Sequence, residues 1–369
     1  MSKRKYKILD LFCGCGGISE GYHLAGFDIA GGIDFNEYAT ITFKHNFKNA
    51  KVYNIDITTF PEEEIRNSFG DVDIVVGGPP CQGFSTANRY QKEMDDPRNK
   101  LFFEYIRFVQ NIHPKVIMIE NVRGLLTRDN GYAINRIKDI LGAEEYNISY
   151  AILDASEYGV PQNRKRAIII GIKKDYKNVY FNFQNIVKKD KTTVDDAIGE
   201  LYLFENCKDG DKTINTPANS PLRRFYRRKD NIIKDHDIVY PAEKVQERIK
   251  HVPQGGNWQF VPEELWPNNR KNRHSSAYKR LDPKTQSCTI DTGNAHSNYF
   301  HPLYNRIPTI RESARLQSFP DEFEFQGPRG SKYRQIGNAV PCYLGKAIGL
   351  SVEKMLKEEK NDTEEGKED

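Results

Sequence analysis

The sequence predicts an α/β protein with a doubly wound, mostly parallel sheet and a second, smaller irregular domain. From Tyr6 to Lys174, short apolar runs rich in Ile and Val alternate with amphipathic stretches, which is the pattern of βαβ units. After about Asp175 the pattern changes to polar, Pro- and Asn-rich sequence with short aromatic segments. Such sequence is typical of irregular structure.

Each apolar run in the first region is short enough for a buried strand, and four of the stretches between these runs have apolar residues at helical spacing. The expected strands are Lys7–Phe12, Asp28–Ile33, Val52–Ile55, Asp73–Val76, Lys115–Ile119, Ser149–Leu153 and Arg166–Ile172. The expected helices are Ile18–Ala25, Glu37–Asn46, Lys100–Ile112 and Gly131–Leu141, and regular signals return at Thr309–Gln317 and Cys342–Lys357.

These signals divide the chain into consecutive parts. We expect an α/β domain over residues 1–175 and a smaller, irregular domain over 176–307. Residues 308–357 should return the chain to the first domain. The charged tail, 358–369, is expected to be disordered.

Composition sets limits on partners and location. The net charge is +4, and basic residues cluster at Arg223–Arg228 and Arg270–Arg280, which is compatible with a polyanion partner or with a solvated surface. The six cysteines form no Cys-x-x-Cys pair and have no His at zinc spacing, so we expect no metal site and a reducing compartment. Without a signal-peptide pattern or a membrane-spanning run, we expect a cytoplasmic protein and no membrane partner.

A glycine-rich turn, Asp10–Gly17, follows the first expected strand and precedes a helix. Doubly wound sheets bind ligands at this position, although similar turns also serve nicotinamide and phosphate sites. Asp34 follows the second strand and could accept hydrogen bonds from ribose hydroxyls, while Asp56 follows the third strand and could hold an adenine amino group. A capping or turn role is the alternative for either carboxylate.

A cysteine stands in the loop after the fourth strand, Gly77–Ser85, where two prolines stiffen the approach to Cys81. A lone cysteine is usually buried and inert. Glu120 lies at the end of the neighbouring fifth strand, so the two side chains should share one cleft.

Together these residues resemble the cytosine-C5 DNA methyltransferase family, and the match runs in order over nearly the whole chain. The matching motifs are Asp10–Gly17, Gly77–Ser85, Glu120–Val122, the Gln-x-Arg-x-Arg of Gln162, Arg164 and Arg166, the late helix Arg311–Pro320, and Gln335–Pro341. The resemblance implies a Rossmann-like S-adenosylmethionine-dependent methyltransferase, in which residues 1–175 form the catalytic, cofactor-binding domain. Residues 176–307 would form the target-recognition domain, which reads double-stranded DNA.

The resemblance also implies roles for single residues. Cys81, Glu120, Arg164 and Arg166 would be catalytic, with the arginines steadying the cytosine O2 and ordering the Cys81 loop. The cofactor S-adenosylmethionine, released as S-adenosylhomocysteine, would be bound by Asp10, Phe12, Gly14, Gly16, Gly17, Asp34, Asp56, Pro80 and Asn338. DNA contacts are expected from Ser85, Arg89, Gln91, Arg270, Arg273, Tyr278 and Arg280.

The residue types fit the chemistry independently of the family. Cytosine C5 is a poor nucleophile, and addition of a thiolate at C6 creates an enamine that can attack a sulfonium methyl group. Cys81 supplies the thiol, and Glu120 can hydrogen-bond or protonate N3. A base inside a duplex must first be flipped out.

Two alternatives remain at this stage. An RNA cytosine methyltransferase shares most of these motifs, but the Cys-Phe-Thr of the tRNA-directed branch is absent after the late helix. A catalytically inactive DNA-binding homologue is disfavoured because Cys81, Glu120, Arg164 and Arg166 are all present. We expect a monomeric bacterial or phage modification enzyme that serves beside a restriction endonuclease without binding it.

Overall fold

The computed structural model describes residues 5–80, 99–175, 179–207, 210–266, 278–292 and 299–365. The chain forms two compact units. Unit 1 comprises residues 1–154, 165–188 and 342–369, and unit 2 comprises residues 155–164 and 189–341. This division differs from the expected domains because residues 155–164 and 308–341 pack within unit 2.

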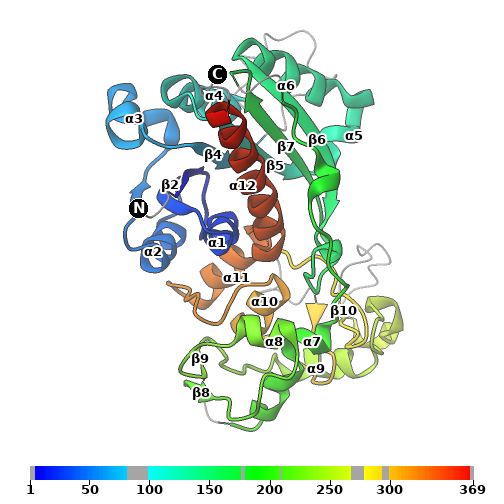
Figure 1. The fold of residues 1–369 in the computed structure, drawn as a ribbon. Helices are drawn as coiled ribbons and strands as arrows, with labels where there is room; N and C mark the ends of the chain where they lie inside the picture. The colour runs from blue at the N-terminus through cyan, green and yellow to red at the C-terminus, as the bar shows by residue number, and fades with distance from the viewer. Residues whose placement is uncertain are drawn as a thin grey trace. The chain divides into compact units, whose positions relative to one another are not determined.

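Unit 1 is built on a seven-stranded sheet with the order β3-β2-β1-β4-β5-β7-β6 (Figure 1). Strands β1 to β5 pair in parallel, and β7 runs antiparallel to both β5 and β6. The mostly parallel sheet is therefore confirmed. The strands are β1 Lys7–Leu11, β2 Asp28–Asp34, β3 Lys51–Asn54, β4 Ile74–Gly77, β5 Val116–Val122, β6 Tyr146–Asp154 and β7 Lys165–Lys173.

Helices cover both faces of this sheet. Side chains of α3 Glu62–Phe69, α4 Lys100–Ile112 and α6 Tyr132–Ala143 share one apolar core with β1, β4 and β5. The other face carries α1 Gly17–Leu24, α2 Glu37–Asn46 and α12 Cys342–Glu365. Gly31 and Gly32 mark the two faces, because a Cβ on Gly31 would meet Phe69 of α3 and one on Gly32 would meet Phe43 of α2.

The two helices α1 and α12 lie side by side (Figure 1). A Cβ on Gly21 would lie 2.6 Å from the Cα of Gly345, so the helix backbones approach each other closely at these two glycines. The return of the chain to the first domain is thus accomplished by α12. This helix continues to Glu365, past the point where the sequence suggested a disordered tail.

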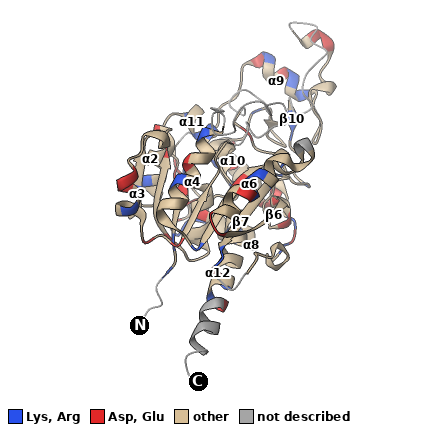
Figure 2. Ribbon diagram, turned by 90° about the horizontal axis from the view of Figure 1, so that it is seen from above, with Lys and Arg blue, Asp and Glu red and all other residues tan. Residues whose placement is uncertain are grey.

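The four helices expected between the strands are present, and α3 is an additional helix that we did not expect. Its first turn carries three glutamates, and only Ile65 and Phe69 are buried in the core. In Figure 2 its start is visibly acidic.

Short elements in unit 1 are α5 Gly124–Thr127 and the 3₁₀ helices η1 Ile57–Thr59, η4 Arg128–Gly131 and η6 Phe183–Asn185. No helix in the described residues is both long and apolar enough to cross a membrane.

Unit 2 is irregular, as the sequence indicated. Its strands have two residues each: β8 Lys212–Thr213, β9 Ile232–Ile233, β10 Lys279–Arg280 and β11 Tyr299–Phe300. The helices are α7 Val194–Ile198, α8 Pro221–Tyr226, α9 Glu243–Lys250, α10 Ile310–Leu316 and α11 Arg329–Asn338. The 3₁₀ helices are η5 Ala155–Glu157, η7 Gly199–Phe204, η8 Trp258–Phe260 and η9 Glu263–Leu265.

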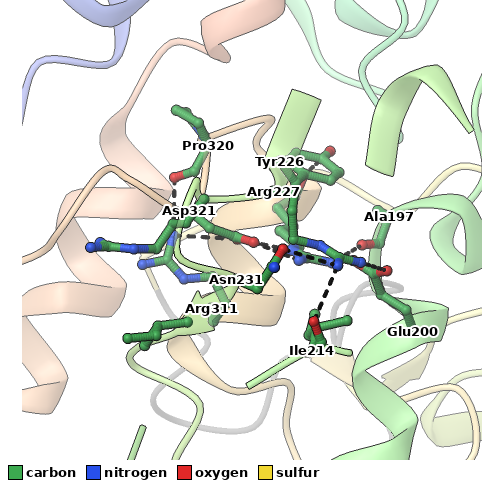
Figure 3. Close-up of polar contacts among 12 residues, drawn as sticks. Ala197, Glu200, Ile214, Tyr226, Arg227, Asn231, Arg311, Pro320 and Asp321 are labelled. Atoms are coloured by element: carbon green, nitrogen blue, oxygen red, sulfur yellow. Dashed lines mark hydrogen bonds and ion pairs between the residues drawn. The ribbon is translucent and has the colours of Figure 1, made fainter. Parts of the chain in front are cut away.

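Buried ion pairs hold α10 within unit 2 (Figure 3). The guanidinium of Arg315 binds both carboxylate oxygens of Asp321, at 2.9 and 2.6 Å, and also Glu200 at 2.8 Å. Glu200 in turn pairs with Arg227 at 2.7 Å. Because buried charges are costly unless they are paired, this network fixes α10 against η7 and α8. It explains why the late helix belongs to unit 2.

Candidate active site

The carboxyl ends of β1 to β5 lie along one edge of the sheet, because these strands are parallel. The turn after β1 is tight: the amide of Gly16 donates to the carbonyl of Cys13 at 2.9 Å, and Gly16 has a φ of 98°. A side chain at Gly16 would also meet Phe47 at 2.7 Å. Glycine is therefore required there, and the turn leads directly into α1.

Asp34, at the end of β2, is hydrogen-bonded to this turn. Its two carboxylate oxygens accept hydrogen bonds from the amides of Gly14, at 2.9 Å, and Asn36, at 2.8 Å. Burial raises the pKa of Asp34 above its ordinary value. The structure thus brings the predicted residues Gly14 and Asp34 together at the carboxyl edge of the sheet.

Asp10 lies inside the sheet rather than at its surface. It is 1% exposed, and the hydroxyl of Ser19 donates to its carboxylate at 2.6 Å. Burial raises the pKa of Asp10 to about 8, against the partly compensating hydrogen bond from Ser19. This position favours a role in holding α1 against β1 over direct contact with a ligand.

The next two strands add an exposed carboxylate and an exposed aromatic ring to this edge. Asp56 follows β3, and its carboxylate caps η1 by accepting from the amide of Thr58 at 2.9 Å, which lowers its pKa. Phe35 follows β2 directly after Asp34 and is 78% exposed. We did not single out Phe35 from the sequence, although an aromatic residue beside a strand-end carboxylate is the signal that could have identified it.

Glu120 and Arg166 form an ion pair on two neighbouring strands. The Nε of Arg166 in β7 lies 2.8 Å from the Oε1 of Glu120 in β5, and the side chains are 16% and 17% exposed. The other carboxylate oxygen of Glu120 faces Gly78, where a Cβ would lie only 3.3 Å from it. The pair therefore stands beside the segment that follows β4.

That segment is held by the next residue of β5. The side-chain amide of Asn121 donates to the carbonyl of Pro79 at 2.9 Å, and its oxygen accepts from the amide of Val122 at 2.9 Å. Pro79 is buried and Pro80 is exposed. Cys81, the expected nucleophile, follows Pro80 but lies outside the described residues, as do Ser85, Arg89 and Gln91. Sequence reasoning named Glu120 but missed the positioning role of Asn121.

Arg164 and Gln162 are buried in unit 2. The guanidinium of Arg164 donates to the carbonyls of Ile290, at 3.0 Å, and Gly337, at 3.1 Å. Gln162 binds Gln317 at 3.0 Å and the amide of Ile290 at 2.9 Å. The guanidinium of Arg164 therefore binds backbone carbonyls, whereas that of Arg166 binds the carboxylate of Glu120. Asn338, at the end of α11, is exposed and follows directly after Gly337.

Burial disfavours the thiolate form of most described cysteines. It raises the pKa of Cys13, Cys15 and Cys342 well above the ordinary range, and that of Cys288 to about 11. Cys207 is exposed. Because the thiolate is the nucleophile, these four cysteines are poor candidates for covalent catalysis.

Arg280, which we expected to contact DNA, and two arginines of the first basic cluster bind partners within the protein. Arg280 donates to the backbone carbonyls of Pro302, Ile249, Val252 and Leu303 and to the side chain of Asn305. This placement fits a structural role better than a DNA contact. Arg227 and Arg228, in the first basic cluster, pair with carboxylates. Arg270 and Arg273 lie outside the described residues, and Tyr278 is half-buried.

Comparison with known proteins agrees with this geometry. The model of the family described as C-5 cytosine-specific DNA methylase matches residues 6–354. Type II methyltransferase M.DdeI of Desulfomicrobium norvegicum is 34% identical over 92% of this chain and 87% of its own length. Type II methyltransferase M1.HphI of Haemophilus parahaemolyticus is 34% identical over 94% of this chain and 86% of its own.

Solved structures show the same fold. A prophage-encoded DNA modification methyltransferase from E. coli superposes with a TM-score of 0.78 and 27% identity, covering 96% of this chain and 100% of that one. The S. pombe Dnmt2 methyltransferase superposes with a TM-score of 0.56 at 18% identity, covering 95% of this chain and 99% of that one. With the family model spanning nearly all of its length, this chain belongs to the C-5 cytosine-specific DNA methylases.

Proposed function

We propose that the protein methylates C5 of a cytosine flipped out of a specific short sequence in double-stranded DNA, through a covalent bond between Cys81 and C6. The observation that carries this proposal is the Glu120–Arg166 pair. It stands at the same sheet edge as the glycine-rich turn and beside the Gly78–Pro80 segment that leads into Cys81. A cofactor and a base could therefore be bound next to each other.

The residues along this edge fit S-adenosylmethionine. Gly14 has open space around the position of a Cβ, so a ligand can approach its backbone. Asp34 retains lone pairs for ribose hydroxyls, the exposed ring of Phe35 offers a stacking surface for adenine, and Asp56 can accept from the adenine amino group. Phe12, Gly16, Gly17 and Pro80 would complete the site within unit 1, with Asp10 supporting it from within the sheet. Asn338, the remaining cofactor residue expected from the sequence, belongs to unit 2. When bound, the cofactor supplies an electrophilic methyl group and leaves as S-adenosylhomocysteine.

The chain's own residues then activate the base. The thiolate of Cys81 adds to C6, and the displaced electron pair moves toward N3, where Glu120 donates a hydrogen bond or a proton. The resulting enamine makes C5 nucleophilic, so C5 accepts the methyl group. Loss of the C5 proton to a base and expulsion of the Cys81 thiolate then restore the ring double bond.

Neighbouring residues position these groups. Arg166 orients Glu120 through their 2.8 Å contact and can also reach the cytosine O2. Asn121 holds the carbonyl of Pro79, two residues before Cys81. We assign Arg164 to a supporting role, since its guanidinium is bound to the Ile290 and Gly337 carbonyls.

The DNA would be contacted by residues from two parts of the sequence. Ser85, Arg89 and Gln91 follow Cys81 and could occupy the space left by the flipped base, and Arg270 and Arg273 could reach bases or phosphates. Because the similar proteins M.DdeI and M1.HphI are named type II methyltransferases, we infer a modification enzyme that acts as a monomer and protects DNA from a restriction endonuclease without binding it.

Bisulfite sequencing tests this proposal directly. DNA from cells that express the protein should contain 5-methylcytosine at one position within a single short sequence, and DNA from cells expressing Cys81→Ser should contain none. Purified protein should likewise methylate duplex DNA and leave tRNA unmodified. Methylation of tRNA alone, or of no nucleic acid at all, would contradict the proposed function.

A further inference from the structure

One arginine of α4 binds both ends of the short helix η1 in unit 1. Nη2 of Arg107 donates to the carbonyl of Ile57 at 2.9 Å, and Nη1 donates to the carbonyl of Phe60 at 3.0 Å. Ile57 is the first residue of η1 and Phe60 follows its last residue, so the two hydrogen bonds span the whole element. A lysine could not make both bonds in this geometry, because its ammonium lacks the planar fork of donors.

The charge of Arg107 is balanced within its own helix. Its Nε lies 2.7 Å from a carboxylate oxygen of Glu104, three residues earlier in α4, and the arginine side chain is 23% exposed. With its charge paired in this way, the arginine acts on η1 through directed hydrogen bonds to two backbone carbonyls. The bonds therefore fix the position of η1 relative to α4.

Apolar packing supports the same contact between α4 and η1. Ile57 and Phe60 are buried in the core of unit 1. The ring of Phe60 lies 5.4 Å, centroid to centroid, from the ring of Phe108, which follows Arg107 in α4 and is fully buried. Buried side chains of this kind have little freedom to shift, because protein interiors are closely packed. The apolar side of η1 and its two carbonyls are thus held by the same helix.

The residue that begins η1 is Asp56, whose exposed carboxylate accepts a hydrogen bond from the amide of Thr58. The residue before it is bound to the end of β2, because the amide of Ile55 donates to the carbonyl of Asp34 at 3.1 Å. Asp56 therefore lies between two fixed points in unit 1, the end of β2 on one side and the carbonyls held by Arg107 on the other.

We propose that Arg107 is a positioning residue for the adenine end of the cofactor site, which holds η1 so that the Asp56 carboxylate faces the adenine amino group. This inference rests on the proposed function, in which S-adenosylmethionine binds at the carboxyl edge of the sheet. Arg107 acts through Asp56, since its own donors are bound to Glu104 and η1. A carboxylate in this place accepts from an amino group and repels a carbonyl oxygen, so Arg107 sets the selectivity for adenine over a 6-oxopurine.

Ligand binding to the full-length protein tests this selectivity without catalysis. The two ligands are S-adenosylhomocysteine and S-inosylhomocysteine, in which a carbonyl oxygen replaces the adenine amino group, and isothermal titration calorimetry gives the Kd of each. We expect the unaltered protein to bind S-adenosylhomocysteine roughly tenfold more tightly, the scale of one hydrogen bond to a charged group. Arg107→Met keeps the apolar stem and removes the donors, so the two Kd values should become nearly equal.

Two further variants separate the geometry of Arg107 from its charge and from general packing. Arg107→Lys keeps the charge without the fork of donors and should lose selectivity as Arg107→Met does, so full selectivity in this variant would overturn the inference. The matched control is Arg66→Met. Arg66 in α3 donates to the carbonyl of Asn111 in α4 at 3.1 Å and so also joins two elements of unit 1. Its replacement should leave both Kd values unchanged.

Asp56→Ala tests whether Arg107 acts through the carboxylate. This variant should lose selectivity by itself, and adding Arg107→Met should reduce the ratio of the Kd values no further, because both changes remove one contact. A further loss in the double variant would overturn the inference. So would an Arg107→Met protein that binds both ligands equally more weakly and is less stable to heat, since that result indicates a structural role alone.

The same measurements judge the proposed function separately. If the unaltered protein bound neither S-adenosylhomocysteine nor S-inosylhomocysteine, the proposed cofactor and function would be wrong. If it preferred S-adenosylhomocysteine and lost this preference in Asp56→Ala but kept it in both Arg107 variants, only the role of Arg107 would be wrong. We expect the KM for S-adenosylmethionine to rise roughly tenfold in Arg107→Met, again the scale of one such hydrogen bond, with kcat at saturating cofactor unchanged.

Discussion

Glu120 lies 2.8 Å from Arg166, and its other carboxylate oxygen faces Gly78. Replacement by glutamine keeps the size and hydrogen-bonding capacity of the side chain but removes the acidic proton. We expect Glu120→Gln to lower kcat by roughly 10²-fold, the scale of one positioned acid. Binding of cofactor and DNA should persist. Single-turnover methylation measurements with duplex DNA would give the rate.

The control for Glu120→Gln is Glu104→Gln. Glu104 also pairs with an arginine on the same unit, at 2.7 Å from Arg107, and is similarly shielded from solvent. Because it lies in α4 rather than at the strand ends, its replacement should leave kcat unchanged. A Glu120→Gln rate equal to that of the unaltered protein across pH would remove Glu120 from the mechanism.

The raised pKa of Asp10 predicts that the stability of the fold depends on pH. Its pKa is about 8 in the folded protein, against an ordinary value of 3.8. Between these values the folded protein keeps the proton and the unfolded chain releases it, so stability falls as pH rises. Asp10→Asn removes this loss, and the variant should gain stability relative to the unaltered protein by up to about 1.4 kcal/mol per pH unit. Urea denaturation from pH 5 to 8 measures the difference, and a constant offset over that range would refute the assignment.

Single residues differ in how far sequence could predict them. Glu120 was predictable because it ends a strand next to the one that precedes Cys81. The role of Arg280 was not, because a basic residue in a polar segment suggests DNA, and only packing shows that its donors are bound to backbone carbonyls. The place of Phe35 directly after the strand-end carboxylate of Asp34 can be read from the sequence, but we did not recognise its significance.

At the scale of elements, the strands were predictable because each is a short Ile- and Val-rich run with clear ends. Helix α3 was missed because it is short and buries only two apolar side chains, Ile65 and Phe69, although their i, i+4 spacing is helical. The extension of α12 to Glu365 was missed because its charged residues suggested disorder, although Glu and Lys are good helix formers.

The contact between α1 and α12 gives a test of packing. In Gly21→Ala the new methyl group would lie 2.6 Å from the Cα of Gly345, so the helices must separate. We expect a loss of about 1–3 kcal/mol in the free energy of unfolding. Gly142→Ala in α6 is the control, because nothing lies within 4 Å of its Cβ position, and it should be neutral or stabilising. Chemical denaturation of both variants measures their free energies of unfolding. Equal values would show that the helices are not in close contact.

The ion pairs of α10 give a second test at this scale. Glu200→Gln leaves one side of the buried Arg315 and Arg227 guanidiniums without a carboxylate. Breaking a buried pair should cost about 3 kcal/mol. Glu247→Gln breaks an exposed pair with Lys250 and should leave the unfolding transition in place. If Glu200→Gln also left the midpoint of the unfolding transition unchanged, this network would not be what stabilises α10 in unit 2.

For the whole molecule, sequence order was a good guide to function and a poor guide to the division into units. Residues 308–341 were expected to rejoin the first domain, but Arg311 and Arg315 bind partners between Ala197 and Asp235 and so belong to unit 2. Such long-range partners leave no periodic signal in the sequence. The order of motifs, by contrast, was sufficient to indicate the family, because it does not depend on where the units divide.

The central claim is the covalent adduct between Cys81 and the target cytosine. Duplex DNA with 5-fluorocytosine at the methylated position should trap the protein when S-adenosylmethionine is present, because fluorine takes the place of the C5 proton whose removal releases the thiolate. Cys81→Ser should bind DNA but not be trapped, since a hydroxyl is hardly ionised at neutral pH. Peptide mass spectrometry of the trapped complex is the decisive measurement. We predict the adduct on Cys81, and an adduct on Cys207 or any other cysteine would contradict the mechanism.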